Sequence, residues 1–426
     1  MFCLSVPAGT IKLRSLTGKS KNMMFWESGC VMNFIEEAKD IFPAVRAFRR
    51  YIHENAETGF DLPLTKKAIT ERLDGMGVFW EEIGGGIVAV VGTGRKNILL
   101  RSEMDALPMF EDNQLPFRSK VQRAHMCGHD MNAAMLMGTI TLLKRHESKL
   151  GGQLVALFQP NEEGTVPGGP SGAEEVVKSG FLDKYPVRKG FHFHLNAKSP
   201  LNYLNYGKGR TFGASTSFQI RLIGKSAHGS RSYEGKDPMN AAVHLYNILY
   251  SIVNREVDVF KHTIFYILPM SASTVNMIPD EMIMNCRLLA YDDEVTPYLM
   301  ERFKEAASGV AGAFRMQHEF RRISYVPGIE ATPEWTDRLL KSAVKILPAG
   351  RINTEPEVKR GAEDFSFIGN RLKERTCFFL GAGPDEETAY EYGQHSSKVI
   401  FNENTLPVGI ALESTMVFDY LNSDEE

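Results

Sequence analysis

The sequence predicts an α/β protein whose mainly parallel sheet belongs to a larger domain that is interrupted by a smaller, ferredoxin-like βαββαβ domain. Three observations predict this. Short apolar β-rich runs alternate with helical segments over residues 34–195, which is typical of a parallel sheet covered by helices. Residues 216–326 then change to the order β-α-β-β-α-β. At 426 residues, the chain is also long for a single hydrophobic core.

The first part of the chain opens with two helical segments. Apolar residues recur at helical spacing in residues 34–54 and 62–77. Four β-rich runs come next, at residues 85–92, 97–104, 152–159 and 190–195. A further helical segment, residues 131–149, separates the second of these runs from the third. Apolar strands that alternate with helices favour parallel pairing.

The inserted domain is predicted from its own pattern. Strands are expected at 216–224, 262–270, 281–290 and 318–326, with helices at 237–253 and 293–317. We place this domain at residues 213–326, so that residues 32–212 and 327–426 together form the larger domain. Residues 1–31 do not resemble the rest of the chain, and we interpret them as an extension or a misplaced start, with a transit peptide as the alternative.

Composition excludes some classes of function. The formal net charge is only -3, from 49 basic and 52 acidic residues, so neither nucleic acid nor a membrane surface is an expected partner. No apolar run approaches the roughly 20 residues of a spanning helix. The five cysteines are widely spread and lack CxxC spacing, which favours a reducing, cytoplasmic location over a disulfide framework.

Reactive side chains gather where the predicted strands end. Glu103 and Asp105 follow one run, Glu162 and Glu163 follow another, and His192 and His194 lie in "GFHFHL". "HMCGHD", residues 125–130, directly precedes a helix and contains Cys127 and His129 around a flexible glycine. Ligands bind beyond the carboxyl ends of the strands in open α/β sheets. The joint pattern therefore predicts a divalent metal site.

Each feature has alternatives when it is taken alone. Cys127 and His129 could be a nucleophile and its base, or could only cap and pack a loop. A histidine in a strand is more often a core residue than a ligand. Asp130 could accept the free ring N–H of a ligating histidine. Adjacent glutamates point in different directions, so one of Glu162 and Glu163 can bind metal while the other takes a proton from water.

Seven ordered blocks of the sequence resemble one known family. The blocks are "LRSEMDALP", "HMCGHD", "FQPNEEG", "GKSAHGS", "VNMIPD", "GAEDFS" and "GQHSSKVIFNEN". They resemble the amidohydrolase branch of the aminoacylase- and carboxypeptidase-type metallopeptidases, which includes hippurate hydrolases, auxin-conjugate amidohydrolases and aminobenzoyl-glutamate hydrolases. The resemblance covers nearly everything after residue 40.

The resemblance implies a dinuclear metal centre and a general base. It implies five metal ligands, which are Cys127, His129, Glu163, His194 and His395. The general base falls on Glu162, and His192 remains an alternative to His194. The ions are expected to be zinc or manganese, with cobalt or nickel also compatible.

The resemblance also implies a lid and dimerisation role for the inserted domain. His228 of "GKSAHGS" would reach the active site of a second subunit and stabilise the oxyanion, which implies a homodimer. Asn276 and Arg287 fall where the family binds the substrate's carboxylate. Arg287 could instead pair within its sheet.

The expected function is hydrolysis of the amide bond of an N-acyl amino acid or a related conjugate. A dipeptidase or carboxypeptidase with the same metals, a cysteine hydrolase using Cys127, and a non-catalytic binder of small molecules are the alternatives. The chain departs from the family pattern at Glu103, where aspartate is common, at Asn161 and Ala56, and in a longer loop after Glu163. Glu103, Asn161 and the longer loop could alter the shape of the pocket, so they bear on the substrate more than on the reaction.

Overall fold

The computed structural model describes residues 32–165, 168–274, 277–383 and 391–424. One compact unit, Phe34–Glu426, contains all the described helices and strands. Residues 1–31, which we interpret as an extension or a misplaced start, lie outside the described residues. No helix in the described part combines the length and the apolar character needed to cross a bilayer.

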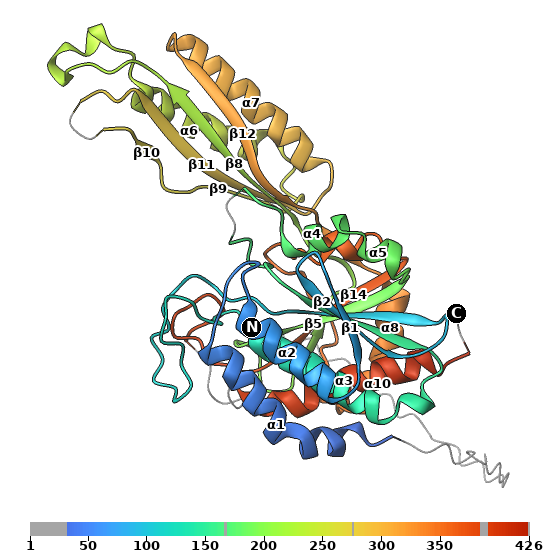
Figure 1. Ribbon diagram of the computed structural model, residues 1–426. Coiled ribbons are helices and arrows are strands. Elements are labelled where there is room, and N and C mark those ends of the chain that lie inside the picture. Colours follow the sequence, from blue (N-terminus) through green and yellow to red (C-terminus); the bar gives the residue numbers. More distant parts are fainter. Residues whose placement is uncertain (1–31, 166–167, 275–276, 384–390, 425–426) are drawn as a thin grey trace, which may run out of the picture. The chain divides into compact units, whose positions relative to one another are not determined.

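A seven-stranded sheet lies at the centre of the larger part of the molecule (Figure 1). Its strands, in spatial order, are β1 (Phe79–Ile83), β2 (Gly86–Gly92), β4 (Gln153–Gln159), β3 (Asn97–Glu103), β5 (Lys189–Asn196), β14 (Glu374–Gly381) and β6 (Leu204–Tyr206). The four central strands, from β4 to β14, are parallel. The outer strands β1, β2 and β6 pair antiparallel. The predicted α/β class with a mainly parallel centre is confirmed, and the antiparallel edges are additions to it.

Helices cover both faces of this sheet. They are α1 (Phe34–Glu54), α2 (Pro63–Gly75), α3 (His129–Arg145), α4 (Gly172–Lys178), α5 (Phe181–Lys184), α8 (Pro333–Ala343), α9 (Ser366–Gly369) and α10 (Leu406–Leu421). Helix α3 contacts α1, α10 and the central strands, whereas α4 and α9 pack on β4 and β14 (Figure 1). Strands β3 and β4 are buried along almost their whole length, which explains their continuous apolar sequences.

Helix α3 is nearly fully buried, including its first residue, His129. A helix that is apolar on all sides has to be enclosed, and α1 and α10 enclose it against the sheet. The start of α3 is therefore held rigidly beside the carboxyl ends of β3 and β5. This placement fixes the position of "HMCGHD".

The segment between Ala214 and Val326 forms a second, antiparallel sheet. Its strands are β8 (Ala214–Ile223), β9 (Thr263–Ile267), β10 (Ser271–Ala272), β11 (Glu281–Ala290) and β12 (Gln317–Val326). Both β9 and β10 pair with β11, β11 pairs with β8, and β8 pairs with β12. Helices α6 (Pro238–Glu256) and α7 (Val295–Ala313) complete the predicted βαββαβ order. Alternating burial along β8 reflects one face packed against these helices.

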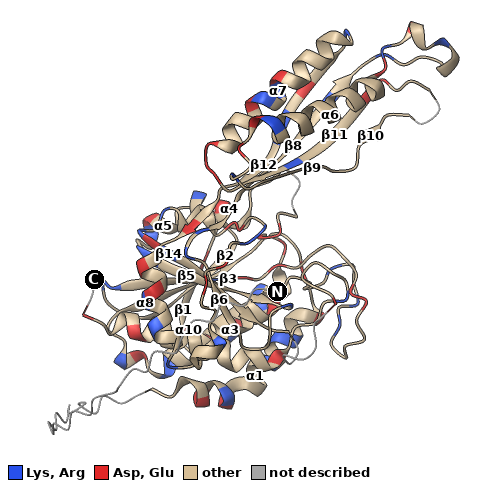
Figure 2. Cartoon of the chain, turned by 180° about the vertical axis from the view of Figure 1, so that it is seen from behind, with Lys and Arg blue, Asp and Glu red and all other residues tan. Residues whose placement is uncertain are grey.

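Smaller elements join the two sheets in sequence. A two-stranded sheet pairs β7 (Gly209–Phe212) with β13 (Ile329–Ala331). Four 3-10 turns lie at Glu147–Lys149, Gly229–Glu234, Ala349–Arg351 and Glu403–Thr405. The division into domains at residues 212/213 and 326/327 remains a prediction. Figure 2 shows acidic and basic segments interspersed along α7 and α8, in keeping with the small net charge.

Candidate metal centre and active site

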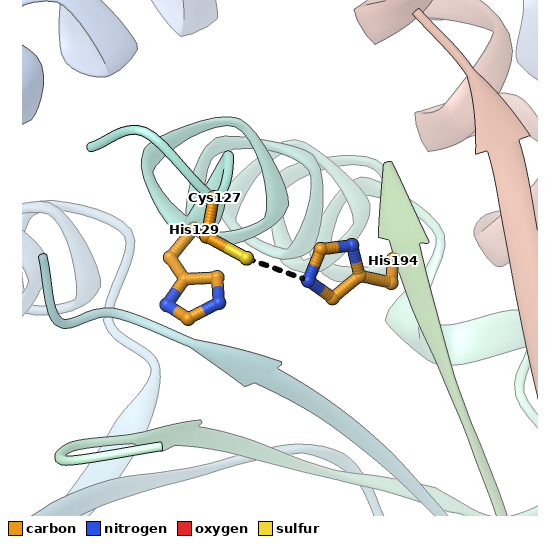
Figure 3. Close-up of side chains that lie close together, drawn as sticks. All are labelled: Cys127, His129 and His194. Carbon is orange, nitrogen blue, oxygen red and sulfur yellow. Dashed lines mark hydrogen bonds between the residues drawn. The ribbon is translucent and has the colours of Figure 1, made fainter. Parts of the chain in front are cut away.

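The site begins at the start of α3, where Cys127 and His129 flank Gly128. Gly128 has a φ of +98°, in the left-handed region that favours glycine. A Cβ at this position would lie 2.9 Å from the ring of Phe401, so no side chain fits. The turn directs the side chains of Cys127 and His129 into the same space (Figure 3). This geometry agrees with the role predicted for Gly128, which is to let the backbone turn between Cys127 and His129.

His194 approaches the same point from β5. Its Nε2 is 3.4 Å from Cys127 Sγ (Figure 3), and its Nδ1 donates to the carbonyl oxygen of Leu195 at 2.8 Å. His129 Nδ1 donates in the same way to the carbonyl oxygen of Asp105 at 3.0 Å. In a neutral ring these hydrogen bonds leave the lone pair on Nε2. Both imidazoles therefore present Nε2 as a ligand atom.

The glutamate pair follows β4 and is held by Asp105. The backbone N–H groups of Glu162 and Glu163 donate to the two carboxylate oxygens of Asp105 at 3.1 and 3.2 Å. Glu163 Oε1 lies 4.0 Å from His129 Nε2 and 3.4 Å from His395 Nε2. Glu162 Oε2 lies 3.7 Å from His129 Nε2. The pair thus reaches the site with two differently directed carboxylates.

His395 completes the group from the C-terminal part of the chain. It has a φ of +67°, which is uncommon for a residue with a Cβ, and its N–H donates to the carbonyl oxygen of Met126 at 2.9 Å. Its side chain is 56% exposed, whereas that of His129 is fully buried. His395 therefore forms the solvent side of the cluster. Strained backbone of this kind is often found at functional sites.

Burial and neighbouring charges perturb the titration of the cluster. Burial raises the pKa of the Cys127 thiol well above its usual value, and the charge of Glu163 raises it further. Burial lowers the pKa of His129, but Cys127 and the hydrogen bond to Asp105 outweigh this and hold the pKa well above 6.5. Burial raises the pKa of Glu162 well above its usual value, followed by the charges of neighbouring carboxylates. Burial thus favours the neutral forms of the Cys127 thiol and of the Glu162 carboxyl.

The donor atoms fit divalent ions. Five sets of described residues bring ligand atoms within 4.8 Å of one another, and three of them lie at this site: Cys127, His129 and His194; Cys127, Glu163 and His395; and His129, Glu162 and Glu163. His129 Nε2 and Glu163 Oε1 are buried and have no hydrogen-bond partner within the described chain. Buried polar atoms of this kind normally have partners. Thiolate, imidazole and carboxylate donors suit zinc and neighbouring transition metals.

The cluster opens into a cavity of about 1100 Å³. Cys127, Glu162, Glu163, His194 and His395 all line it. A volume of this size accommodates an amino-acid conjugate together with water.

Comparison with known proteins identifies the family. The model of peptidase family M20/M25/M40 matches residues 99–418. Thermostable carboxypeptidase 1 of Saccharolobus solfataricus is 31% identical over 92% of this chain and 100% of its own. The chain belongs to the M20/M25/M40 peptidase family. It is a metal-dependent hydrolase of amide bonds, as the sequence predicted.

Other members of the M20 family cover nearly the whole chain. Hippurate hydrolase of Campylobacter jejuni is 29% identical over 92% of this chain and 100% of its own. The crystal structure of a dinuclear metal-binding M20 peptidase from Bacillus subtilis matches with a TM-score of 0.72 at 24% identity. It covers 90% of this chain and 99% of its own, so the M20 fold extends over nearly all of both chains.

The two strand histidines belong to different groups. His194 lies with Cys127 and His129, whereas His192 lies with Glu103 and Glu363. Successive residues on one face of a strand are about 6.6 Å apart, which separates the two imidazoles. This geometry favours His194 over His192 as the M20 ligand, and the ligand roles themselves remain predictions.

The predicted substrate-binding residues are only partly brought together. Arg287, on β11, lines the cavity and donates to Ser215 Oγ at 3.1 Å. Ser215 belongs to β8 of the same sheet, and Arg287 forms no ion pair among the described residues, so both the substrate-binding role and the pairing within its sheet stay predictions. His228 is exposed, contacts Ser230 and does not line the cavity. Asn276 lies outside the described residues.

Sequence reasoning missed the main role of Asp105 and misjudged Asp130. Asp105 fixes both glutamates and His129, but its only sequence signal was its place after a strand. Asp130 does not accept the ring N–H of His129, because the Asp105 carbonyl takes it. Instead Asp130 Oδ2 forms an ion pair with Arg49 Nε at 2.6 Å and a hydrogen bond with His53 Nδ1 at 2.8 Å, both from α1.

Proposed function

We propose that this M20 protein cleaves the amide bond of N-acyl amino acids or related amino-acid conjugates, using two divalent ions. The observation that carries the proposal is the convergence of Cys127, His129, Glu163, His194 and His395 beside Glu162 in one cavity. The name of the hippurate hydrolase relative supports this substrate class, since it names an N-acyl amino acid. The name of the thermostable carboxypeptidase relative favours peptides as the second candidate.

We propose that the five convergent donors hold the two ions. Cys127, His129 and His194 approach one point, and Glu163 and His395 approach another, with Cys127 near both. Zinc or manganese are the ions that we propose, and cobalt or nickel are compatible with the same donors. When bound, such ions lower the pKa of water and polarise a carbonyl group.

Glu162 is the proposed general base. Its side chain is 14% exposed at the cavity wall, and it is directed differently from Glu163. Its raised pKa makes it a better acceptor of a proton from water than an ordinary glutamate. Its carboxylate would take that proton during attack on the amide and deliver it to the leaving nitrogen.

Arg287 is the proposed partner of the substrate's carboxylate, together with Asn276. Its guanidinium faces the cavity without a carboxylate of the described chain. A planar guanidinium pairs two carboxylate oxygens at once. We further propose that His228 acts in the site of a second subunit of a homodimer, because its own chain leaves it exposed. The inserted domain would act as lid and dimerisation domain.

A cysteine hydrolase is the weaker alternative. Cys127 is buried, and burial raises its pKa, which is the opposite of what a thiolate nucleophile needs. A cytoplasmic location is proposed because Cys127, Cys286 and Cys377 are free thiols.

The test is turnover of a panel of N-acyl amino acids, hippurates, aminobenzoyl-glutamate and free dipeptides by mass spectrometry. We expect Glu162→Gln to lower kcat by roughly 100- to 10,000-fold while metal content stays unchanged. Glu174→Gln is the control, because Glu174 lines the same cavity on α4 and carries the same charge. Preference for substrates with a free amino group would favour the peptidase alternative. Equal turnover by wild type and Glu162→Gln would refute the role of Glu162.

A further inference from the structure

A second polar cluster lies behind the candidate active site, around the buried Arg101 of β3. Arg101 Nη1 contacts Glu103 Oε1 and lies 3.0 Å from Glu363 Oε1, and Arg101 Nη2 lies 2.6 Å from Asp364 Oδ1. All four side chains are at most 4% exposed. Three carboxylates thus surround one guanidinium, which leaves a formal excess of negative charge. Such charge is costly to bury unless a cation or proton balances it.

His192 lies in this cluster with its hydrogen-bonding capacity unused. It is fully buried on β5, and neither ring nitrogen makes a hydrogen bond of ordinary geometry within the described chain. Its Nδ1 is 3.9 Å from Glu103 Oε1, and its Nε2 is 4.0 Å from Glu363 Oε2. These separations are too long for hydrogen bonds. Two ligands that each lie about 2.0–2.2 Å from an ion are at most about 4.4 Å apart, so these separations are compatible with a shared ion.

The two carboxylates have coordination capacity left for a cation. Glu363 Oε1 forms an ion pair with Arg101 and accepts a hydrogen bond from the N–H of Phe365. Glu363 Oε2 accepts no hydrogen bond from the described residues. Glu103 Oε2 accepts a hydrogen bond from Asn132 Nδ2 at 3.1 Å, and Glu103 Oε1 faces both Arg101 and His192. One ligand atom from each of Glu103, His192 and Glu363 lies within 4.8 Å of the others.

We propose that Glu103, His192 and Glu363 bind an additional divalent cation with a structural role. The cation would occupy the space between the imidazole and the two carboxylates, with Arg101 holding both carboxylates from the other side. Two oxygens and one imidazole nitrogen suit Zn²⁺ or Mn²⁺. Glu363 lines the active-site cavity, which provides a route of entry.

This site is separate from the proposed dinuclear centre, since it shares none of that centre's five ligands. The inference therefore does not rest on the proposed function. His192 reaches it from the same face of β5 as His194, two residues earlier, and Glu103 reaches it from the end of β3.

The first test counts ions in the full-length protein. Wild type and His192→Leu are loaded with Mn²⁺ or Zn²⁺, freed of excess by gel filtration and analysed by mass spectrometry for metal per chain. We expect His192→Leu to hold about one ion fewer than wild type. His125→Leu is the matched control, because His125 is equally buried with both ring nitrogens unpartnered in the described chain, yet it belongs to none of the metal-compatible groups found there. His194→Leu reports separately on the dinuclear centre.

The second test does not depend on a variant that folds. Crystals of the wild-type protein containing Mn²⁺ or Zn²⁺ are measured at the absorption edge of the metal. We expect an anomalous peak about 2.0–2.2 Å from a His192 nitrogen and from oxygens of Glu103 and Glu363. Equal metal content in wild type and His192→Leu, or a peak only beside Cys127 and His194, would overturn the proposal. Loss of an ion in His194→Leu alone would support the dinuclear centre and not this site.

Discussion

Glu413 provides a direct test of how burial controls ionisation in this fold. It lies on α10, is 3% exposed, and its Oε2 accepts a hydrogen bond from Thr139 Oγ1 on α3 at 2.6 Å. Burial raises the pKa of Glu413 to about 8, the Thr139 hydrogen bond opposes this rise, and the charge of Glu103 adds to it. No cation of the described chain forms an ion pair with Glu413. We expect Glu413→Gln to stabilise the protein at alkaline pH.

The sign follows from the two pKa values. Between the ordinary value of 4.5 and about 8, the folded protein keeps a proton that the unfolded chain has released. The free energy of unfolding therefore falls as pH rises through this window, by up to about 1.4 kcal/mol per pH unit. Glutamine carries no such proton. The stability of Glu413→Gln relative to wild type should thus rise by about 2–3 kcal/mol between about pH 5.5 and pH 7.5.

The assay is urea unfolding followed by tryptophan fluorescence at both pH values, with metal and salt held constant. All other titrating groups are common to both proteins and cancel in the difference. Glu334→Gln, on the exposed side of α8, controls for the loss of one negative charge. A difference in stability that does not change with pH would show that folding does not raise the pKa of Glu413. A wild type that gains stability relative to Glu413→Gln as pH rises would show that folding stabilises the carboxylate.

Three other substitutions test the packing and the metal centre. Gly172→Ala at the start of α4 would place a Cβ 1.5 Å from a backbone carbonyl oxygen, so we expect it to lose more than about 3 kcal/mol of stability, seen as a lower melting temperature. Gly309→Ala, in open space on α7, should instead gain about 0.5–1 kcal/mol in the same measurement. Arg49→Met removes the ion pair that anchors Asp130, the residue after His129 at the start of α3, and should weaken metal affinity roughly 10-fold in a chelator competition, whereas Arg46→Met should not.

The sequence was most informative for the buried strands of the central sheet, because burial on both faces is visible in their apolar residues. Strands β3, β4 and β5 were predicted from continuous apolar runs, because strands buried on both faces need them. The edge strand β1, Phe79–Ile83, was missed because only one of its five residues is buried. Its antiparallel pairing with β2 depends on the Gly84–Gly85 turn more than on its own side chains.

The site itself could be predicted only in part, since its residues act through the backbone as well as through their side chains. His395 was predicted only through the resemblance of its block "GQHSSKVIFNEN", and it reaches Glu163 through a left-handed backbone that a sequence does not display. Asp105 organises Glu162 and Glu163 by accepting their amide hydrogens, a contact between segments 57 and 58 residues apart. The backbone carbonyl of Asp105 also accepts the ring N–H of His129, a role that the sequence suggested for Asp130 toward a ligating histidine.

The contrast between His192 and His194 shows what the structure adds to the sequence. The two histidines lie two residues apart on one face of β5, and the sequence prediction chose His194 as the ligand with His192 as the alternative. Their surroundings differ because β5 runs past two groups of acids: His194 faces Cys127, whereas His192 faces Glu103 and Glu363. The ring N–H of His194 is bonded to a carbonyl oxygen, which directs Nε2 toward sulfur, while His192 lacks such a bond and both its nitrogens face carboxylates. A partner for the second ring nitrogen is what usually fixes the orientation of a ligating histidine. The geometry thus preorganises Nε2 of His194 for the metal-ligand role that we propose, and it leaves His192 dependent on the cation or proton that fills the space between its two carboxylates.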